Sequence, residues 1–282
     1  MTTHVIHRFA ASGGGTPVNA YIVEGPAGSV VVDATLLVSD ARALRARVDE
    51  LGTPLLGVVI THAHPDHYGG LAELTRDLDV PVFATEGVRD VIRRDDRIKE
   101  QILRPMFGDE WAAERAFPNR IVADRATVDI DGIRLRVVDL GPGESPHDSI
   151  WWLEGDGGRQ VFSADLAYDR HHCYLADGFH RQWLVNIERA RREFPAGTTM
   201  HPGHGLPSGT EVLDWQEGYI KAFLAAVEHA DWTDHDAAKA SVVARMLSYL
   251  PTGRLQFLME LSIDPMVEQL AVRPPASSAS NA

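Results

Sequence analysis

A string of three histidines and one aspartate within six residues limits what this chain can be more than any other feature. It contains His62, His64, Asp66 and His67, and it follows an apolar, β-branched run typical of a buried strand. Residues two apart in an extended chain point to the same side, so His62 and His64 can bind one ion. Pro65 ends the extended run, so that Asp66 and His67 face a second position. Imidazole and carboxylate ligands suit Zn²⁺ and also Fe or Mn, and the string therefore predicts a metal site.

The sequence around this string indicates a layered α/β fold. Apolar runs of strand length precede and follow it, whereas residues 39–51 and 70–78 have a helical pattern. Asp131-Gly132 and Gly157-Gly158 predict hairpin turns between later strands. From Trp183 onward the chain is mainly helical, with an interruption at 197–209. The predicted strands are 19–23, 29–33, 55–60, 80–84, 127–130, 133–138, 149–153 and 159–163.

We expect a single domain over residues 1–282, because the chain contains no internal repeat and no low-complexity linker. Residues 86–120 are interpreted as an inserted helical lid, although their aromatic side chains could equally pack this segment onto the core. Residues 215–270 are predicted to be a helical C-terminal segment and 274–282 a tail. The apolar face that includes Phe223 favours packing on the core over a homodimer contact.

Composition excludes several classes of protein. The net charge of −13 and the lack of a basic patch argue against nucleic acid as a partner. A single cysteine, Cys173, excludes an internal disulfide and the multi-cysteine zinc folds. No run of about 18 apolar residues and no signal-like N-terminus is present, so we expect a cytoplasmic protein that does not enter the membrane.

The histidine string resembles the His-x-His-x-Asp-His motif of the metallo-β-lactamase-fold hydrolases. The run from Val18 to Val23, followed by Val31-Val-Asp33, resembles the opening hairpin of that superfamily. The resemblance implies a four-layer αββα sandwich, in which two mixed sheets lie face to face with helices outside. It also implies that Asp33 supports the metal loop from behind and that the site lies at one edge, between the sheets.

The resemblance further implies a bridging aspartate after a later strand, which corresponds to Asp165, and a last histidine, which corresponds to His204. The third ligand departs from the family pattern, because Glu144 stands where most members have histidine in Pro-Gly-His-Thr. We favour Glu144 over His147, because the next strand should begin some five residues after the ligand and His147 lies too close to it. Some alkylsulfatase-like members also have glutamate in this position.

These assignments imply two divalent metal ions, with zinc favoured and Mn or Fe open because a carboxylate hardens the first site. His62, His64 and Glu144 would bind one ion, Asp66, His67 and His204 would bind the other, and Asp165 would bridge them. A hydroxide shared by the ions would attack an ester, thioester or lactone of small size, and Asp66 would orient the water or relay its proton.

Three alternatives remain open from the sequence. Within the same fold, Glu144 makes an alkylsulfatase or phosphodiesterase the nearest one. A mononuclear iron oxidoreductase similar to sulfur dioxygenases is the second, and a degenerate binding module is the third and least favoured. The loop after Asp165 contains several histidines, of which His172 is predicted to contact substrate.

Overall fold

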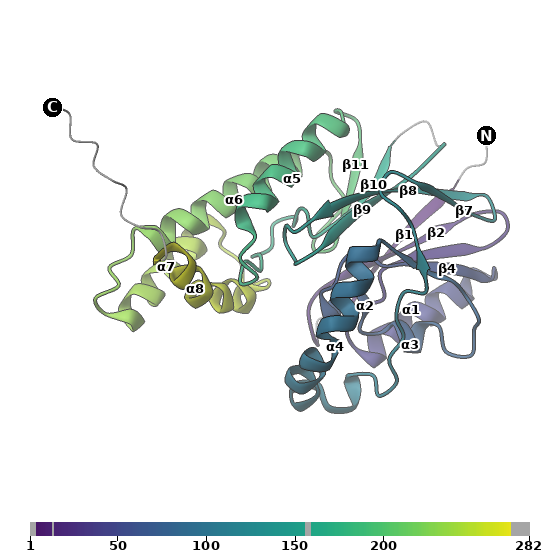
Figure 1. Cartoon of the computed structure of the whole chain (residues 1–282), viewed down its shortest axis with the longest axis horizontal. Coiled ribbons are helices and arrows are strands. Elements are labelled where there is room, and N and C mark those ends of the chain that lie inside the picture. The colour runs from purple at the N-terminus through teal and green to yellow at the C-terminus, as the bar shows by residue number, and fades with distance from the viewer. Residues whose placement is uncertain (1–3, 13, 156–158, 272–282) are drawn as a thin grey trace.

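The computed structural model describes residues 4–12, 14–155 and 159–271. Two β-sheets lie face to face, and helices cover the outer face of each (Figure 1). This arrangement is the four-layer αββα sandwich that the resemblance implied. The predicted turn at Gly157-Gly158 and the predicted tail at 274–282 lie outside the described residues.

The first sheet has six strands in sequence order, β1 to β6. The first three strands pair antiparallel, and the pairs from β3 to β6 are parallel. The parallel strands send their carboxyl ends to one edge, where the histidine string begins. The strands are β1 (Val5–Ala10), β2 (Asn19–Glu24), β3 (Ser29–Val32), β4 (Leu55–Val59), β5 (Val82–Ala84) and β6 (Arg120–Ile121).

The second sheet has five strands in the order β11-β10-β9-β8-β7. Its pairs are antiparallel except for β10 and β11, which run parallel. The strands are β7 (Thr127–Ile130), β8 (Ile133–Gly141), β9 (Asp148–Leu153), β10 (Gln160–Ala164) and β11 (Thr199–Pro202).

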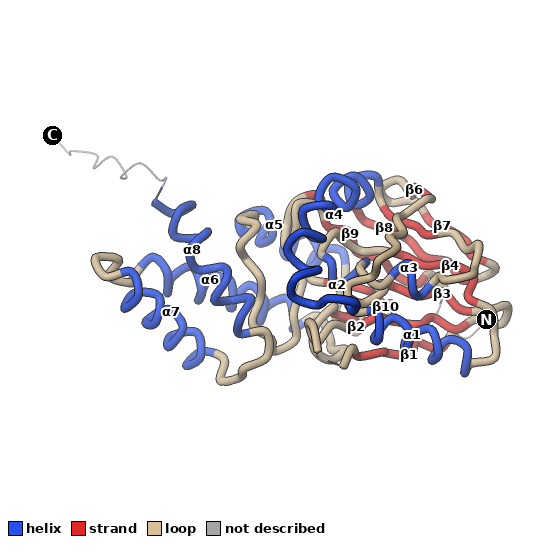
Figure 2. The backbone as a smooth tube through the Cα atoms, turned by 90° about the horizontal axis from the view of Figure 1, so that it is seen from below, coloured by secondary structure: helices blue, strands red, loops and turns tan. Residues whose placement is uncertain are grey.

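The helices form two separate outer layers (Figure 2). On the side of the first sheet lie α1 (Val38–Glu50), α2 (Pro65–Tyr68), α3 (Leu71–Leu74), α4 (Glu86–Phe107) and the 3-10 turn η1 (Gly108–Glu110). On the side of the second sheet lie α5 (His180–Glu193), α6 (Glu211–Glu228), α7 (His235–Tyr249) and α8 (Gln256–Ala271). Among the described residues, no helix is long and apolar enough to cross a membrane.

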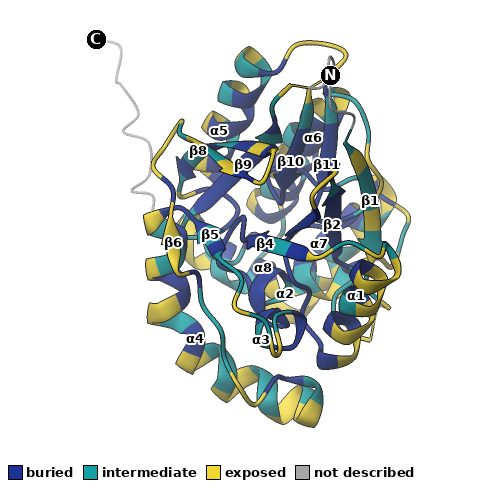
Figure 3. Cartoon of the chain, turned by 90° about the vertical axis from the view of Figure 1, so that its right-hand side faces the viewer, coloured by how far each residue is buried: buried dark blue, intermediate teal, exposed yellow. Residues whose placement is uncertain are grey.

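Strand residues alternate between two cores, as the period of two along a strand requires. In β2, Ala20 and Ile22 pack toward the helices of the first layer, whereas Tyr21 and Val23 pack between the sheets. Because both faces are covered, the central strands are apolar on both sides and buried along most of their length (Figure 3). Sequence patterns of this kind predicted strands but not the sheet to which each one belongs.

The segment predicted as a lid contains one long helix, α4, whose first turns pack on the core of the first sheet. Of its large apolar side chains, Trp111 is fully buried and Phe117 packs on the core, whereas Met106 is 65% exposed. Packing on the core therefore accounts for Trp111 and Phe117, whereas Met106, Ile98 and Ile102 are exposed. In the C-terminal helices Phe223 is buried in the core, as predicted.

Several short elements were not predicted from the sequence. Strand β1 was missed because it is only partly buried and has a mixed polar sequence, without the apolar run of a central strand. Strand β11 covers four residues of the stretch predicted as a break between helices. Helix α2 is a single turn that carries Asp66 and His67. Of the two strands, β11 depends on a partner that is distant in the sequence, because it pairs with β10.

The two neighbouring tryptophans of β9 provide a test of the layered packing. Trp151 is fully buried between the sheets, whereas Trp152 is partly buried and packs edge-on to Phe194 on the outer face. We expect Trp151→Ala to lower the free energy of unfolding by about 3–5 kcal/mol and Trp152→Ala by clearly less. Denaturant unfolding measures both, and equal losses would contradict the packing of the two sheets through Trp151.

Candidate metal centre

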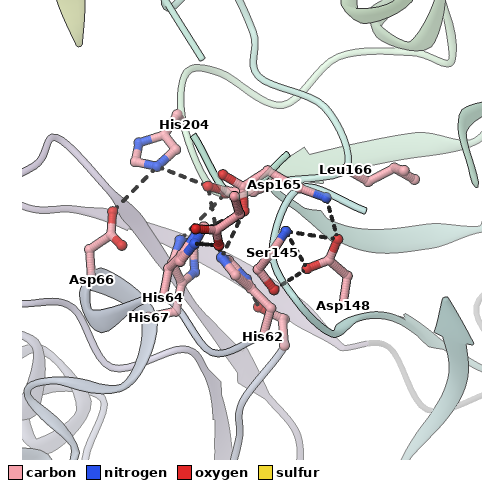
Figure 4. A network of polar contacts seen from close by, with 12 residues as sticks. His62, His64, Asp66, His67, Ser145, Asp148, Asp165, Leu166 and His204 are labelled. Atoms are coloured by element: carbon pink, nitrogen blue, oxygen red, sulfur yellow. Dashed lines mark hydrogen bonds and ion pairs between the residues drawn. The ribbon is translucent and has the colours of Figure 1, made fainter. Parts of the chain in front are cut away.

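The sequence-predicted ligands converge at one edge of the sandwich, on loops that follow strands (Figure 4). Each sheet contributes part of the set, so that the site lies where the two sheets meet. From the first sheet come His62 and His64, after β4, and Asp66 and His67, on α2; from the second come Glu144, between β8 and β9, Asp165, after β10, and His204, after β11. Their ligand atoms form overlapping groups, each within 4.8 Å: His62 with His64 and Glu144; Asp66 with His67 and His204; and His62 with His67 and Asp165.

The first group consists of His62, His64 and Glu144. Oε2 of Glu144 lies 2.8 Å from Nδ1 of His64 and 3.6 Å from Nε2 of His62. His147, the alternative third ligand, is turned away, and its Nε2 lies 2.6 Å from Oδ1 of Asp139. The structure therefore brings Glu144, and not His147, to the two histidines.

The second group consists of Asp66, His67 and His204, and Asp165 lies between the two groups. Nε2 of His204 is 3.5 Å from Oδ2 of Asp66 and 3.2 Å from Oδ2 of Asp165. The other oxygen of Asp165 is 3.4 Å from Nε2 of His67, and its Oδ2 is 3.9 Å from Nε2 of His62. A carboxylate in this position can contact an ion in either group.

Each of the four histidines points one ring nitrogen into the cluster and has the other held by the protein. The outer partners are the Thr61 hydroxyl for His62 (3.1 Å), Asp177 for His64 (3.0 Å), Asp33 for His67 (2.8 Å) and the Pro17 carbonyl for His204 (2.9 Å). Such outer partners orient a metal-binding imidazole and raise its basicity.

The inner atoms meet the requirements of a metal site. The buried atoms that lack a hydrogen-bond partner include Nε2 of His62, His67 and His204, Oε2 of Glu144 and Oδ1 of Asp165. Leaving so many buried polar atoms unsatisfied is costly, and divalent ions would satisfy them together. The mixed imidazole and carboxylate donors suit Zn²⁺, Mn²⁺ or Fe²⁺.

The sequence comparison with known proteins agrees with this geometry. Residues 13–204 match the model of the Metallo-beta-lactamase superfamily, and this stretch contains every residue of the groups described above. The chain belongs to the metallo-beta-lactamase superfamily.

Curated relatives in this superfamily are distant in sequence. A hydroxyacylglutathione hydrolase from Methylobacillus flagellatus is 25% identical over 232 residues, which are 81% of this chain and 75% of the relative. A type 2 metallo-beta-lactamase from Bacteroides fragilis is 23% identical over 179 residues, or 62% of this chain. The match covers 64% of that protein, which is less than two thirds of its length. The first is a hydrolase by name, and the family model together with these relatives confirms the predicted class, a metal-dependent hydrolase, at the level of the family.

A solved structure confirms the predicted fold. The beta-lactamase domain protein from Burkholderia ambifaria superposes with a TM-score of 0.68 and 20% sequence identity, covering 98% of this chain and 92% of that chain. At this identity, the likeness shows the fold and leaves the reaction to be argued from the site.

In this member of the superfamily, the electrostatics of the cluster depend on the imidazoles and carboxylates that face each other. Burial alone would lower the pKa of His67, but Asp165 and Asp33 raise it well above the usual value. Burial alone would also lower the pKa of His204, but Asp165 and Asp66 outweigh that effect and raise this pKa to about 10. At neutral pH these two imidazoles therefore hold protons in the metal-free chain. Metal binding would displace them, so affinity should fall as pH falls.

Hydrogen bonds between the two sheets keep the ligands together. The carbonyl of Thr61 accepts from both the backbone N–H and the hydroxyl of Ser149, at 2.9 and 2.6 Å. On the other side, the N–H of Asn19 donates to the carbonyl of Gly203 at 2.7 Å. Gly203 itself leaves no room for a side chain, because a carbon there would collide with Asp165 and His67.

The loop of Glu144 is held by a buried carboxylate that the sequence did not reveal. Asp148 accepts from the backbone N–H groups of Glu144 and Ser145 and from the Ser145 hydroxyl (Figure 4). Gly143 approaches the same carboxylate so closely that a side-chain carbon there would lie 2.6 Å from Asp148. These contacts fix the backbone at the point where glutamate replaces the usual histidine.

The structure corrects the prediction that His172 contacts substrate. Its ring is buried in the C-terminal helical layer, with Nδ1 at 2.8 Å from the Tyr219 hydroxyl and Nε2 at 3.0 Å from the Thr252 carbonyl. Cys173 is also buried, and burial raises the pKa of its thiol, which argues against a role as nucleophile. His201 pairs with Gln160 outside the cluster.

Tyr168 is a residue of the site that the sequence analysis missed. Its hydroxyl donates to Oε1 of Glu144 at 2.8 Å, and its ring stacks on His204 with centroids 4.8 Å apart. Burial, together with Asp165 and Glu144, raises the pKa of Tyr168 well above the usual value, so the hydroxyl remains a donor. Its position three residues after Asp165 was the only local signal, and no pattern distinguishes it from a core tyrosine.

A cavity of about 250 Å³ opens beside the cluster. His64, Asp66, Glu144, Asp165 and Tyr168 line one end of it, so a bound small molecule would reach both groups of ligands. Clefts of this kind, with few convergent polar groups, are typical of small-molecule sites.

Metal content tests the ligand assignment. We expect about two divalent ions per chain in the purified protein, and about one after Glu144→Ala, because Glu144 completes the first group. His147→Ala should retain both ions, since that side chain pairs with Asp139. Elemental analysis measures the ratio, and a chain that keeps two ions without Glu144 but loses one without His147 would overturn the assignment.

Proposed function

We propose that this chain is a dinuclear metal-dependent hydrolase that acts on an ester, thioester or lactone of small size. The observation that carries the proposal is the pair of donor groups, each with three ligands, joined by the carboxylate of Asp165. A cluster built for a single ion would not need both groups. The reaction class is also that of the relatives named above, which are hydrolases.

Two bound ions would supply an acidified water as nucleophile and a positive charge that polarises the scissile carbonyl. Two residues of the chain that line the cavity, Asp66 and Tyr168, would act together with the ions. Burial alone would raise the pKa of Asp66, but His67 and His204 outweigh that effect and hold this pKa well below its usual value. Asp66 therefore stays ionised and can orient a water by accepting its hydrogen bond. Tyr168 holds Glu144 in place by donating its hydroxyl hydrogen to Oε1, and it also lines the cavity.

Glu144 supports two other candidates. Because some alkylsulfatase-like members of the superfamily also have glutamate in this position, an alkylsulfatase or phosphodiesterase is the nearest alternative. In addition, two histidines and one carboxylate are the ligand set of many non-haem iron oxygenases, as in a sulfur-dioxygenase-like enzyme. The completeness of the Asp66, His67 and His204 group weighs against a single iron.

The three candidates predict different outcomes with the metal-loaded protein. We expect turnover of a p-nitrophenyl ester, an acyl thioester or a lactone, and little turnover of an alkyl sulfate or a phosphodiester. A protein with one iron per chain that consumes oxygen with a persulfide, and hydrolyses none of the esters, would sink the hydrolase proposal. Colorimetric assays and an oxygen electrode provide these measurements.

His201 and His204 form a matched pair for the same assay, because they lie three residues apart and only His204 joins the cluster. We expect His204→Gln to lower kcat/KM at least about 100-fold and His201→Gln to leave it within a few-fold. Equal losses in the two variants, with both still folded by circular dichroism, would mean that the cluster is not the active site.

A further inference from the structure

The cavity beside the cluster has a strongly apolar wall opposite the ligands. Helices α4 and α8, which belong to the two different outer layers (Figure 1), supply this wall. The residues are Ile102, Leu103 and Met106 from α4 and Phe257, Leu258 and Leu261 from α8. A molecule that fills the cavity would therefore have one end at the ligands and the rest between two apolar helices.

Several of these apolar side chains are exposed to solvent although they are large. Ile102 is 55% exposed and Leu261 is 59% exposed, and Met106 and Phe257 are exposed as well. Ile102 and Met106 are four residues apart on α4, as are Phe257 and Leu261 on α8, so each pair lies on one side of its helix. Single exposed apolar side chains are common on protein surfaces, whereas two apolar rows that face one cavity indicate a binding surface.

The charges at the cavity favour an uncharged occupant over a polyanion. Lys99 is the cationic side chain among the described residues that line it. Three carboxylates, those of Asp66, Glu144 and Asp165, line the same cavity, and the chain as a whole carries a net charge of −13. A phosphate-rich carrier group would therefore meet few cationic side chains in this cavity.

We propose that the apolar cleft between α4 and α8 binds the hydrocarbon chain of the substrate, so that the enzyme prefers esters or thioesters of medium-length alkyl acids. This inference rests on the proposed hydrolase function and adds the class of substrate. The scissile carbonyl would lie at the ligands and the alkyl chain would extend along Ile102, Met106 and Leu261. Water adds to the acyl carbon, the bond to the leaving oxygen or sulfur breaks, and the products are the alkyl acid and an alcohol or thiol.

A series of p-nitrophenyl esters from acetate to decanoate tests the proposal with the metal-loaded full chain. Each added methylene that enters the cleft should raise kcat/KM about fourfold until the cleft is filled. Hydrolysis with a flat profile across the series would overturn the inference and leave the hydrolase function standing. No hydrolysis at any length would instead count against the proposed function.

Two isoleucines one turn apart on α4 give a matched pair of variants. Ile102 lines the cavity, whereas Ile98 is equally exposed, at 58%, and does not. We expect Ile102→Ser to lower kcat/KM for the decanoate ester about tenfold more than for the acetate ester. Ile98→Ser should leave the ratio unchanged, and an equal effect of both substitutions would overturn the assignment of the cleft. Leu261→Ser repeats the test from α8.

Binding and size measurements do not depend on turnover. Titration calorimetry should show decanoate binding at least tenfold more tightly than acetate, with a negative heat-capacity change, in the parent and in Ile98→Ser but not in Ile102→Ser. Light scattering distinguishes the other occupant of such a surface, a second copy of the chain. A dimer in the parent that Ile102→Ser converts to a monomer would overturn the proposal.

Discussion

The carboxylate of Asp33 is the interaction on which the candidate metal centre most depends. It follows β3, is buried, and accepts hydrogen bonds from the N–H and hydroxyl of Thr61 and from Nδ1 of His67. A buried carboxylate is tolerated only when it is bonded in this way, so the sequence from β4 to α2 has to lie where Asp33 can reach it. The φ angle of Asp33, +64°, shows that its backbone is held in an unfavourable region to do so.

The second sheet has to bring its ligands to the loop that Asp33 anchors. Glu144, Asp165 and His204 follow three different strands, and they meet the histidine string only because the sheets are packed with their ligand-bearing ends at one edge. The backbone at Ala164, with φ of +46°, turns Asp165 inward at the end of β10. Because the ligands come from both sheets, bound ions would connect the two sheets, and metal binding should therefore also stabilise the folded chain.

The parts of this site that could be predicted are those that one stretch of sequence contains. His62, His64, Asp66 and His67 lie within six residues, so local geometry alone predicts that they converge. Glu144 required the register of the following strand. Tyr168 and Asp177 could not be found, because their partners Glu144 and His64 are 24 and 113 residues away. Asp148 binds Glu144 and Ser145 close by in the sequence, but no spacing marks that contact. The prediction that His172 contacts substrate failed for the opposite reason. This residue is near Asp165 in the sequence, but its loop turns into the helical layer.

Glutamate in place of histidine changes more than the identity of one ligand. A carboxylate has two oxygens, and in this chain Oε2 faces His62 and His64 while Oε1 accepts from Tyr168. The Tyr168 hydroxyl donates and the glutamate oxygen accepts, so the two side chains match each other. Burial raises the pKa of Glu144, which means that the ionised form needs a neighbouring cation. Without metal, protonated imidazoles such as His64 provide that charge; with metal, the ions do, and the protons leave.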